Sequence, residues 1–100
     1  MNNKLTYKIK HIINKNGYTD IIIKHKIDTK DIKISNANVK FRYEPNTDKA
    51  YLSFWNSERH IVCEIEDARI NEIIINDESL SIETDEKIYL CYINKEKLYY

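Results

Sequence analysis

The sequence predicts a mainly β protein, a single small antiparallel β-sandwich or partly open barrel of about seven or eight short strands with at most one short helix. The apolar residues are dominated by isoleucine and eight tyrosines, side-chain types that favour strands. Alanine, the best helix former, is rare, and turn signals separate short alternating runs at regular intervals. A chain of 100 residues is expected to form one β-rich domain spanning 1–100.

Two strands joined by a hairpin are expected at the start of the chain, over residues 4–13 and 21–27. In both segments apolar side chains occupy odd positions and alternate with lysines. The Asn-Gly pair between them favours a tight turn. A three-residue loop, 15–17, sets Ile9 opposite Ile23 and gives its glycine a left-handed conformation, whereas a two-residue turn would mix the two faces. The three-residue loop is therefore the predicted one.

A third strand begins at Ile32, and its alternation changes phase near Asn36, which predicts a bulge or a break there. A loop that contains Pro45 follows, and a fourth strand covers residues 50–55. This pairing sets Arg42 across from Tyr51 and Lys40 across from Ser53, and it turns Leu52 and Phe54 inward.

The remainder of the chain predicts four more short strands, which fall in the segments 61–66, 73–75, 80–82 and 88–93. The last segment is a continuous apolar run, so a strand covered on both faces is expected there. The pattern over residues 66–72 leaves open a short helix or an irregular connection. The tail, 94–100, is expected to be a short helix or an extended end.

Basic and acidic side chains are concentrated in different halves of the chain, although the formal net charge is zero. Residues 1–49 hold eleven basic and five acidic side chains, and residues 50–100 hold five basic and eleven acidic ones. Such a separation either presents a basic and an acidic surface to partners or pairs with itself within the fold.

The first candidate site is a protein-binding surface of aromatic and charged residues. Tyr51 and Trp55 share the strand face opposite the inward residues, near Arg42 and Lys40. Exposed Trp, Tyr and Arg are the residue types that dominate interface energies. A sheet covered on both faces would instead make the two rings part of the core. The chain end supplies a second aromatic pair, Tyr99 and Tyr100, which could equally dock on the sheet.

The second candidate site is a basic patch on the expected hairpin. Four lysines would lie on its outer face: Lys8, Lys10, Lys24 and Lys26. A nucleic-acid backbone would offset their mutual repulsion, and its binding would weaken steeply with salt. An ordinary solvated face, or one that docks on the acidic half, explains the same pattern. Arginine is absent from this segment, which weakens the case for specific phosphate recognition.

No pattern in the sequence indicates catalysis, a cofactor or a metal. His60 and Cys63 are three residues apart, but zinc needs about four clustered ligands. His11 and His25 fall on the expected inward face, where structural histidines are common, and a small nuclease would need them in one cleft. The chain shows no nucleophile elbow or phosphate-binding loop. We therefore expect a protein that is not an enzyme.

A cytoplasmic protein is expected, since the chain shows neither an apolar signal-peptide segment nor a membrane-spanning run. Cys63 and Cys91 lie in apolar stretches and are expected to be buried, reduced thiols. The isoleucine-, lysine- and asparagine-rich composition is similar to that of small phage and plasmid accessory proteins, including inhibitors of host defence systems. The leading interpretation is a protein-interaction module that acts as an inhibitor or adaptor. Nucleic-acid binding is the alternative, and homo-oligomerisation is left open.

Overall fold

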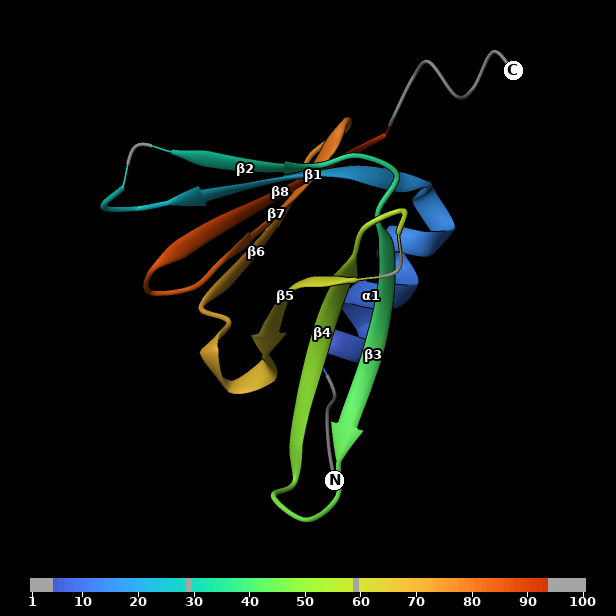
Figure 1. Ribbon diagram of the computed structural model, residues 1–100, viewed down its shortest axis with the longest axis vertical. Helices are drawn as coiled ribbons and strands as arrows, with labels where there is room; N and C mark the ends of the chain where they lie inside the picture. The colour runs from blue at the N-terminus through green and yellow to red at the C-terminus, as the bar shows by residue number, and fades with distance from the viewer. Residues whose placement is uncertain (1–4, 29, 59, 94–100) are drawn as a thin grey trace.

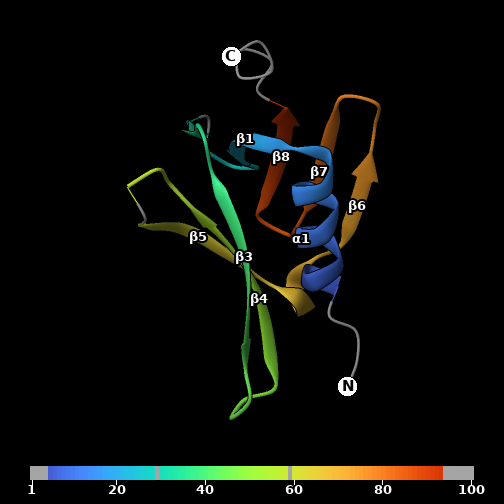
Figure 2. The ribbon, with the colours of Figure 1, turned by 90° about the vertical axis from the view of Figure 1, so that its right-hand side faces the viewer.

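The computed structural model describes residues 5–28, 30–58 and 60–93. It confirms a mainly β fold, with eight strands in two antiparallel sheets and one α-helix, α1 (Leu5–Asn16), in the angle between them (Figures 1 and 2). The large sheet has five strands and the small sheet has three. The sheets do not close into a barrel, so the arrangement matches the predicted sandwich or partly open barrel.

The predicted first strand is wrong, because residues Leu5–Asn16 form α1. Ile9 and Ile13, four residues apart, are buried on one helix face, whereas His11 is exposed on another. Gly17 does adopt the expected left-handed conformation, with φ 76°, but it ends a helix rather than shaping a hairpin loop. The hairpin of residues 4–27 therefore does not exist.

A side chain from far along the chain caps the start of α1. The backbone N–H of Thr6 donates to Asp67 Oδ1 at 2.7 Å. Asp67 begins η1 (Asp67–Arg69), a single 3-10 turn that resolves the connection left open by the sequence. A carboxylate at a helix N-terminus satisfies a backbone donor and opposes the positive end of the helix dipole. This contact ties the helix to the link between the two sheets.

The large sheet combines the first strands after the helix with the last three of the chain. Its members, in spatial order, are β2 (Asp31–Ile34), β1 (Tyr18–His25), β8 (Lys87–Ile93), β7 (Ser79–Glu83) and β6 (Glu72–Ile75). β8 is central, as its apolar run suggests. Tyr89 and Cys91 are buried on its inner face, but Leu90 on the other face is only half-buried. The prediction of full cover on both faces is thus wrong for the outer face.

The small sheet consists of β3 (Asn38–Glu44), β4 (Lys49–Trp55) and β5 (Ile61–Glu66). Its register confirms the prediction, with Arg42 opposite Tyr51 and Lys40 opposite Ser53. The predicted break is also present. Asn36 has a φ of 58°, and the chain passes there from the large sheet to the small one.

The core lies where the inner faces of the two sheets meet beneath α1. Leu52 and Phe54, predicted to point inward, are fully buried. The ring of Phe54 stacks on that of Tyr89, with 5.9 Å between the ring centroids. Because Tyr89 belongs to the large sheet, this pair joins the two layers directly.

Some basic side chains from the first half of the chain form ion pairs with acidic side chains from the second half. Lys26 lies 2.9 Å from Glu83, and Arg42 lies 3.0 Å from Glu64. Both cations come from the basic half and both anions from the acidic half. The folded protein thus neutralises some of the separation internally instead of presenting all of it to solvent.

Candidate functional site

The outer side of the small sheet brings together the aromatic and charged residues that the sequence singles out. Side chains of a strand alternate between faces, and Leu52 and Phe54 occupy the core side. Tyr51 and Trp55 therefore project from the opposite side, where both are half-buried rather than part of the core. We call the set formed by Lys40, Arg42, Tyr51, Trp55 and Glu64 the cation–aromatic face.

A cationic side chain lies over each aromatic ring of this face. Lys40 Nζ lies 4.6 Å from the Trp55 ring centroid, and Arg42 Cζ lies 4.1 Å from that of Tyr51. These distances are in the range in which the ring quadrupole attracts a positive charge. In both cases neighbouring strands supply the cation and the ring. Both cations belong to β3 and both rings to β4, so the two pairs lie on the same face of these strands.

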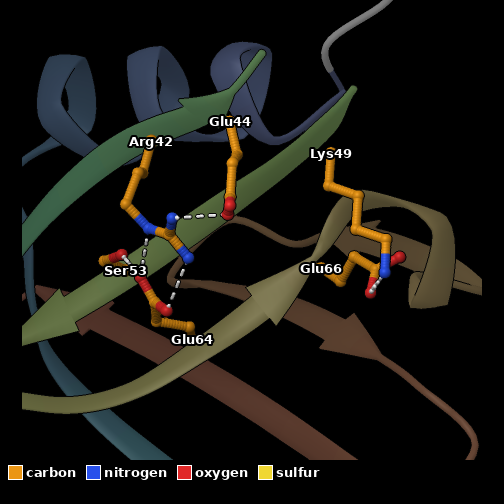
Figure 3. A network of polar contacts seen from close by, with 6 residues as sticks. All are labelled: Arg42, Glu44, Lys49, Ser53, Glu64 and Glu66. Carbon is orange, nitrogen blue, oxygen red and sulfur yellow. Dashed lines mark hydrogen bonds and ion pairs between the residues drawn. The ribbon is translucent and has the colours of Figure 1, made fainter. Parts of the chain in front are cut away.

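A carboxylate from β5 fixes the guanidinium of Arg42 (Figure 3). Arg42 donates to both oxygens of Glu64, from Nε at 3.0 Å and from Nη2 at 3.1 Å. A third donor, Nη1, reaches Glu44 at 3.3 Å. Glu64 also accepts a hydrogen bond from the buried hydroxyl of Ser53. This bidentate arrangement holds the guanidinium in one orientation over the Tyr51 ring.

The network shifts the pKa of both charged partners, Arg42 and Glu64. The hydrogen bonds from Arg42 hold the pKa of Glu64 below its ordinary value of 4.5, and the Ser53 hydroxyl adds to the effect. In turn, Glu64 and Glu44 raise the pKa of Arg42. Both groups are therefore charged throughout the physiological range.

Acid is expected to loosen this network and lower the thermal stability. Because the pKa of Glu64 is lower in the folded protein than its ordinary 4.5, the stabilisation is complete above pH 4.5 and is lost as the pH falls further. Replacing Glu64 with glutamine should reduce the drop in melting temperature below that pH by up to about 5 °C, a modest value because the pair is partly solvated. Thermal unfolding of both proteins from pH 7 to pH 3 measures the difference, and parallel curves would contradict it.

One polar atom near this face has no partner within the described part of the chain. The indole Nε1 of Trp55 is buried and makes no hydrogen bond there. An unpaired buried donor costs free energy, so such a group in a native structure needs an explanation.

Arg42, Tyr51 and Trp55 lie on one surface, as the sequence predicts, but the contact of Glu64 with Arg42 is not among the predictions. The signal that could have found this residue is the register of the next strand. Ser53 pairs with both Lys40 and Glu64, so the same-face rule applied one strand further places the carboxylate on the face of Arg42, diagonal to it. Tyr99 and Tyr100 lie outside the described residues.

The basic patch does not form as predicted, because its lysines lie on two unlike elements. Lys8 and Lys10 belong to α1, whereas Lys24 and Lys26 belong to β1 and the residue after it. The second pair is engaged in salt bridges: Lys24 lies 3.4 Å from Asp31, and Lys26 lies 2.9 Å from Glu83.

The candidate histidines and thiols do not gather into a reactive centre. His11 packs edge-on against Tyr7, with 4.4 Å between ring centroids, and is exposed, contrary to its predicted inward position. His25 Nδ1 accepts the backbone N–H of Ile27 at 3.3 Å. Cys63 and Cys91 are free, and burial raises the pKa of each thiol to about 12. Unreactive thiols of this kind suit a structural position.

The described residues contain neither a metal-binding cluster nor a membrane-spanning helix. No group of three or more His, Cys, Asp or Glu side chains within residues 5–28, 30–58 and 60–93 is placed to hold a metal ion. Within the same ranges, no helix has the length and apolar character that crossing a membrane requires.

Comparison with known proteins identifies no relative: the chain matches no family model, no curated protein and no solved structure.

Proposed function

We propose that the protein is a non-enzymatic interaction module that binds a partner protein through the cation–aromatic face. The observation that carries this proposal is the presence of two cation–ring pairs, at 4.6 Å and 4.1 Å, on the side of the small sheet turned away from the core. Tyr, Trp and Arg contribute most of the binding energy at protein interfaces. Here all three project from one face of two paired strands.

The rigidity of this face favours tight binding. Arg42 is held by two hydrogen bonds to Glu64, and both aromatic residues stand on the central strand of the small sheet. Side chains that are already ordered lose less conformational entropy when a partner arrives. The unpaired indole N–H of Trp55 adds a donor that a partner's acceptor would satisfy after a small movement of the ring.

The setting that we propose is the cytoplasm of a bacterium, with the protein acting as an inhibitor or adaptor encoded by a phage or mobile element. Two free thiols, Cys91 buried and Cys63 only half-buried, suit a reducing compartment. The composition, rich in isoleucine, lysine and asparagine, suits an AT-rich genome. Nucleic-acid binding has weaker support, because Lys24 and Lys26 are already paired with carboxylates.

The test is affinity capture from a low-GC bacterial lysate, treated with nuclease and analysed by mass spectrometry, followed by binding curves for variants. Replacing Trp55 or Tyr51 with alanine should weaken binding of the captured protein at least about tenfold. The melting temperature should change by no more than about 5 °C, since neither ring belongs to the core.

The matched control is Tyr7→Ala, which removes an aromatic ring that is 45% exposed on α1, away from the cation–aromatic face. This variant should bind the partner as the wild type does. Equal binding by Trp55→Ala, Tyr51→Ala and the wild type would contradict the proposal. Recovery of nucleic acid, with loss of every protein partner after nuclease treatment, would favour the nucleic-acid alternative instead.

A further inference from the structure

The edge of the large sheet at β6 combines unpaired backbone with exposed apolar side chains. Among the described residues, β7 is the only strand that pairs with β6, which lies at the end of the sheet (Figure 2). Ile74 is 45% exposed and Ile75 is 58% exposed. A strand edge of this kind is a template for pairing with another strand.

The backbone groups that reach this edge belong to Ile73 and Ile75. Asn76 N donates to Ser79 O, so even-numbered residues of β6 turn their N–H and C=O toward β7. Because the direction alternates along a strand, the odd-numbered residues turn theirs outward. Two isoleucines thus offer a donor and an acceptor each to an incoming strand.

The other three edges carry features that hinder pairing. Lys33 stands in the middle of β2, and Lys40 and Arg42 stand along β3. A bulge between β4 and β5 makes the register of β5 irregular. Charged residues and bulges are the common protections of a sheet edge. The three consecutive isoleucines of β6 include none of these, so β6 is the edge best suited to pairing.

The sequence of β6 matches a second copy of itself in one antiparallel register. Residues opposite each other in such a pair share a face, so only positions of equal parity meet about a two-fold axis. With Ile74 on the axis, Ile73 lies opposite Ile75 of the second copy. At the ends of the pair, Glu72 then lies opposite Asn76. Shifting the register in one direction would place Glu72 opposite Ile74, and shifting it in the other direction would place Ile73 opposite Asp77. Either shift sets a carboxylate against an isoleucine.

We infer that the protein forms a symmetric dimer in which β6 pairs antiparallel with β6 of a second copy, with Ile74 on the two-fold axis, joining the two large sheets into one. Ile73 and Ile75 exchange backbone hydrogen bonds across the junction, and isoleucine meets isoleucine on both faces. The dimer uses the large sheet and leaves the cation–aromatic face of the small sheet open, so it goes beyond the proposed function.

A charge swap at the axis tests both the dimer and its register. Sedimentation analysis of the full chain should give a mass twice the 12.0 kDa of one chain. In a dimer of Ile74→Lys or of Ile74→Glu, the two copies of residue 74 would carry like charges and face each other. Each substitution should therefore raise the dissociation constant of the dimer at least about tenfold. Mixing the two variants sets lysine against glutamate and should restore a heterodimer with nearly the wild-type dissociation constant.

A backbone variant supplies the second measurement. Ile75→Pro removes an N–H that points away from β7, so it should abolish the dimer while the monomer stays folded, whereas Ile75→Val should retain the dimer. A wild-type chain that is monomeric at about 1 mM, well above the range of specific dimers, would overturn the inference. So would a tighter dimer for Ile74→Lys, since that result places residue 74 opposite Glu72.

Discussion

Replacing Phe54 with alanine is expected to lower the free energy of unfolding by about 3–5 kcal/mol. The side chain is 0% exposed and stacks on Tyr89 of the other sheet, so the substitution opens a cavity between the two layers. A domain of this size has roughly 5–15 kcal/mol of stability in total, and much of the variant should be unfolded at 37 °C. Urea denaturation followed by tryptophan fluorescence measures the loss.

The matched control is Phe54→Leu, which keeps most of the apolar volume and should cost about 1–2 kcal/mol. The difference between the two variants reports the cavity rather than the loss of the aromatic ring alone. A loss below about 1 kcal/mol for Phe54→Ala would contradict a core shared by the two sheets.

The pairing of β3 with β4 is predictable because the alternation of both strands is unbroken and the turn between them is marked. Pro45 and Asp48 delimit the connection between β3 and β4, and counting outward from it gives the observed pairing of Arg42 with Tyr51. Since the side-chain period of a strand is two, the correct register also assigns every residue to its face. This part of the candidate site therefore followed from the sequence.

The order of the strands could not be predicted, since it depends on contacts between distant segments. β1 pairs with β8, so residues such as Ile21 and Cys91 become neighbours although they are seventy positions apart in the chain. No local pattern encodes that choice. The partner of Arg42 was missed for a related reason, because Glu64 reaches it from a third strand.

The sequence does not predict the helix because the periodicity of a strand and that of a helix coincide over the first apolar positions. Leu5, Ile9 and Ile13 are four residues apart, a spacing that fits both the alternation of a strand and one face of a helix. Gly17 is equally ambiguous, since a left-handed glycine suits a hairpin loop and the end of a helix. Ile12 beside Ile13 was the one departure from alternation that favoured a helix.

The helix makes a prediction that a strand would not. Ile9 is 1% exposed on the buried face of α1, and Ile9→Ala should lower the free energy of unfolding by about 2–5 kcal/mol. His11 is exposed, and His11→Ala should cost less than about 1 kcal/mol. In a strand, both side chains would point into the core and both substitutions would be costly. Urea denaturation of the two variants separates the alternatives, and equal losses would contradict the helix.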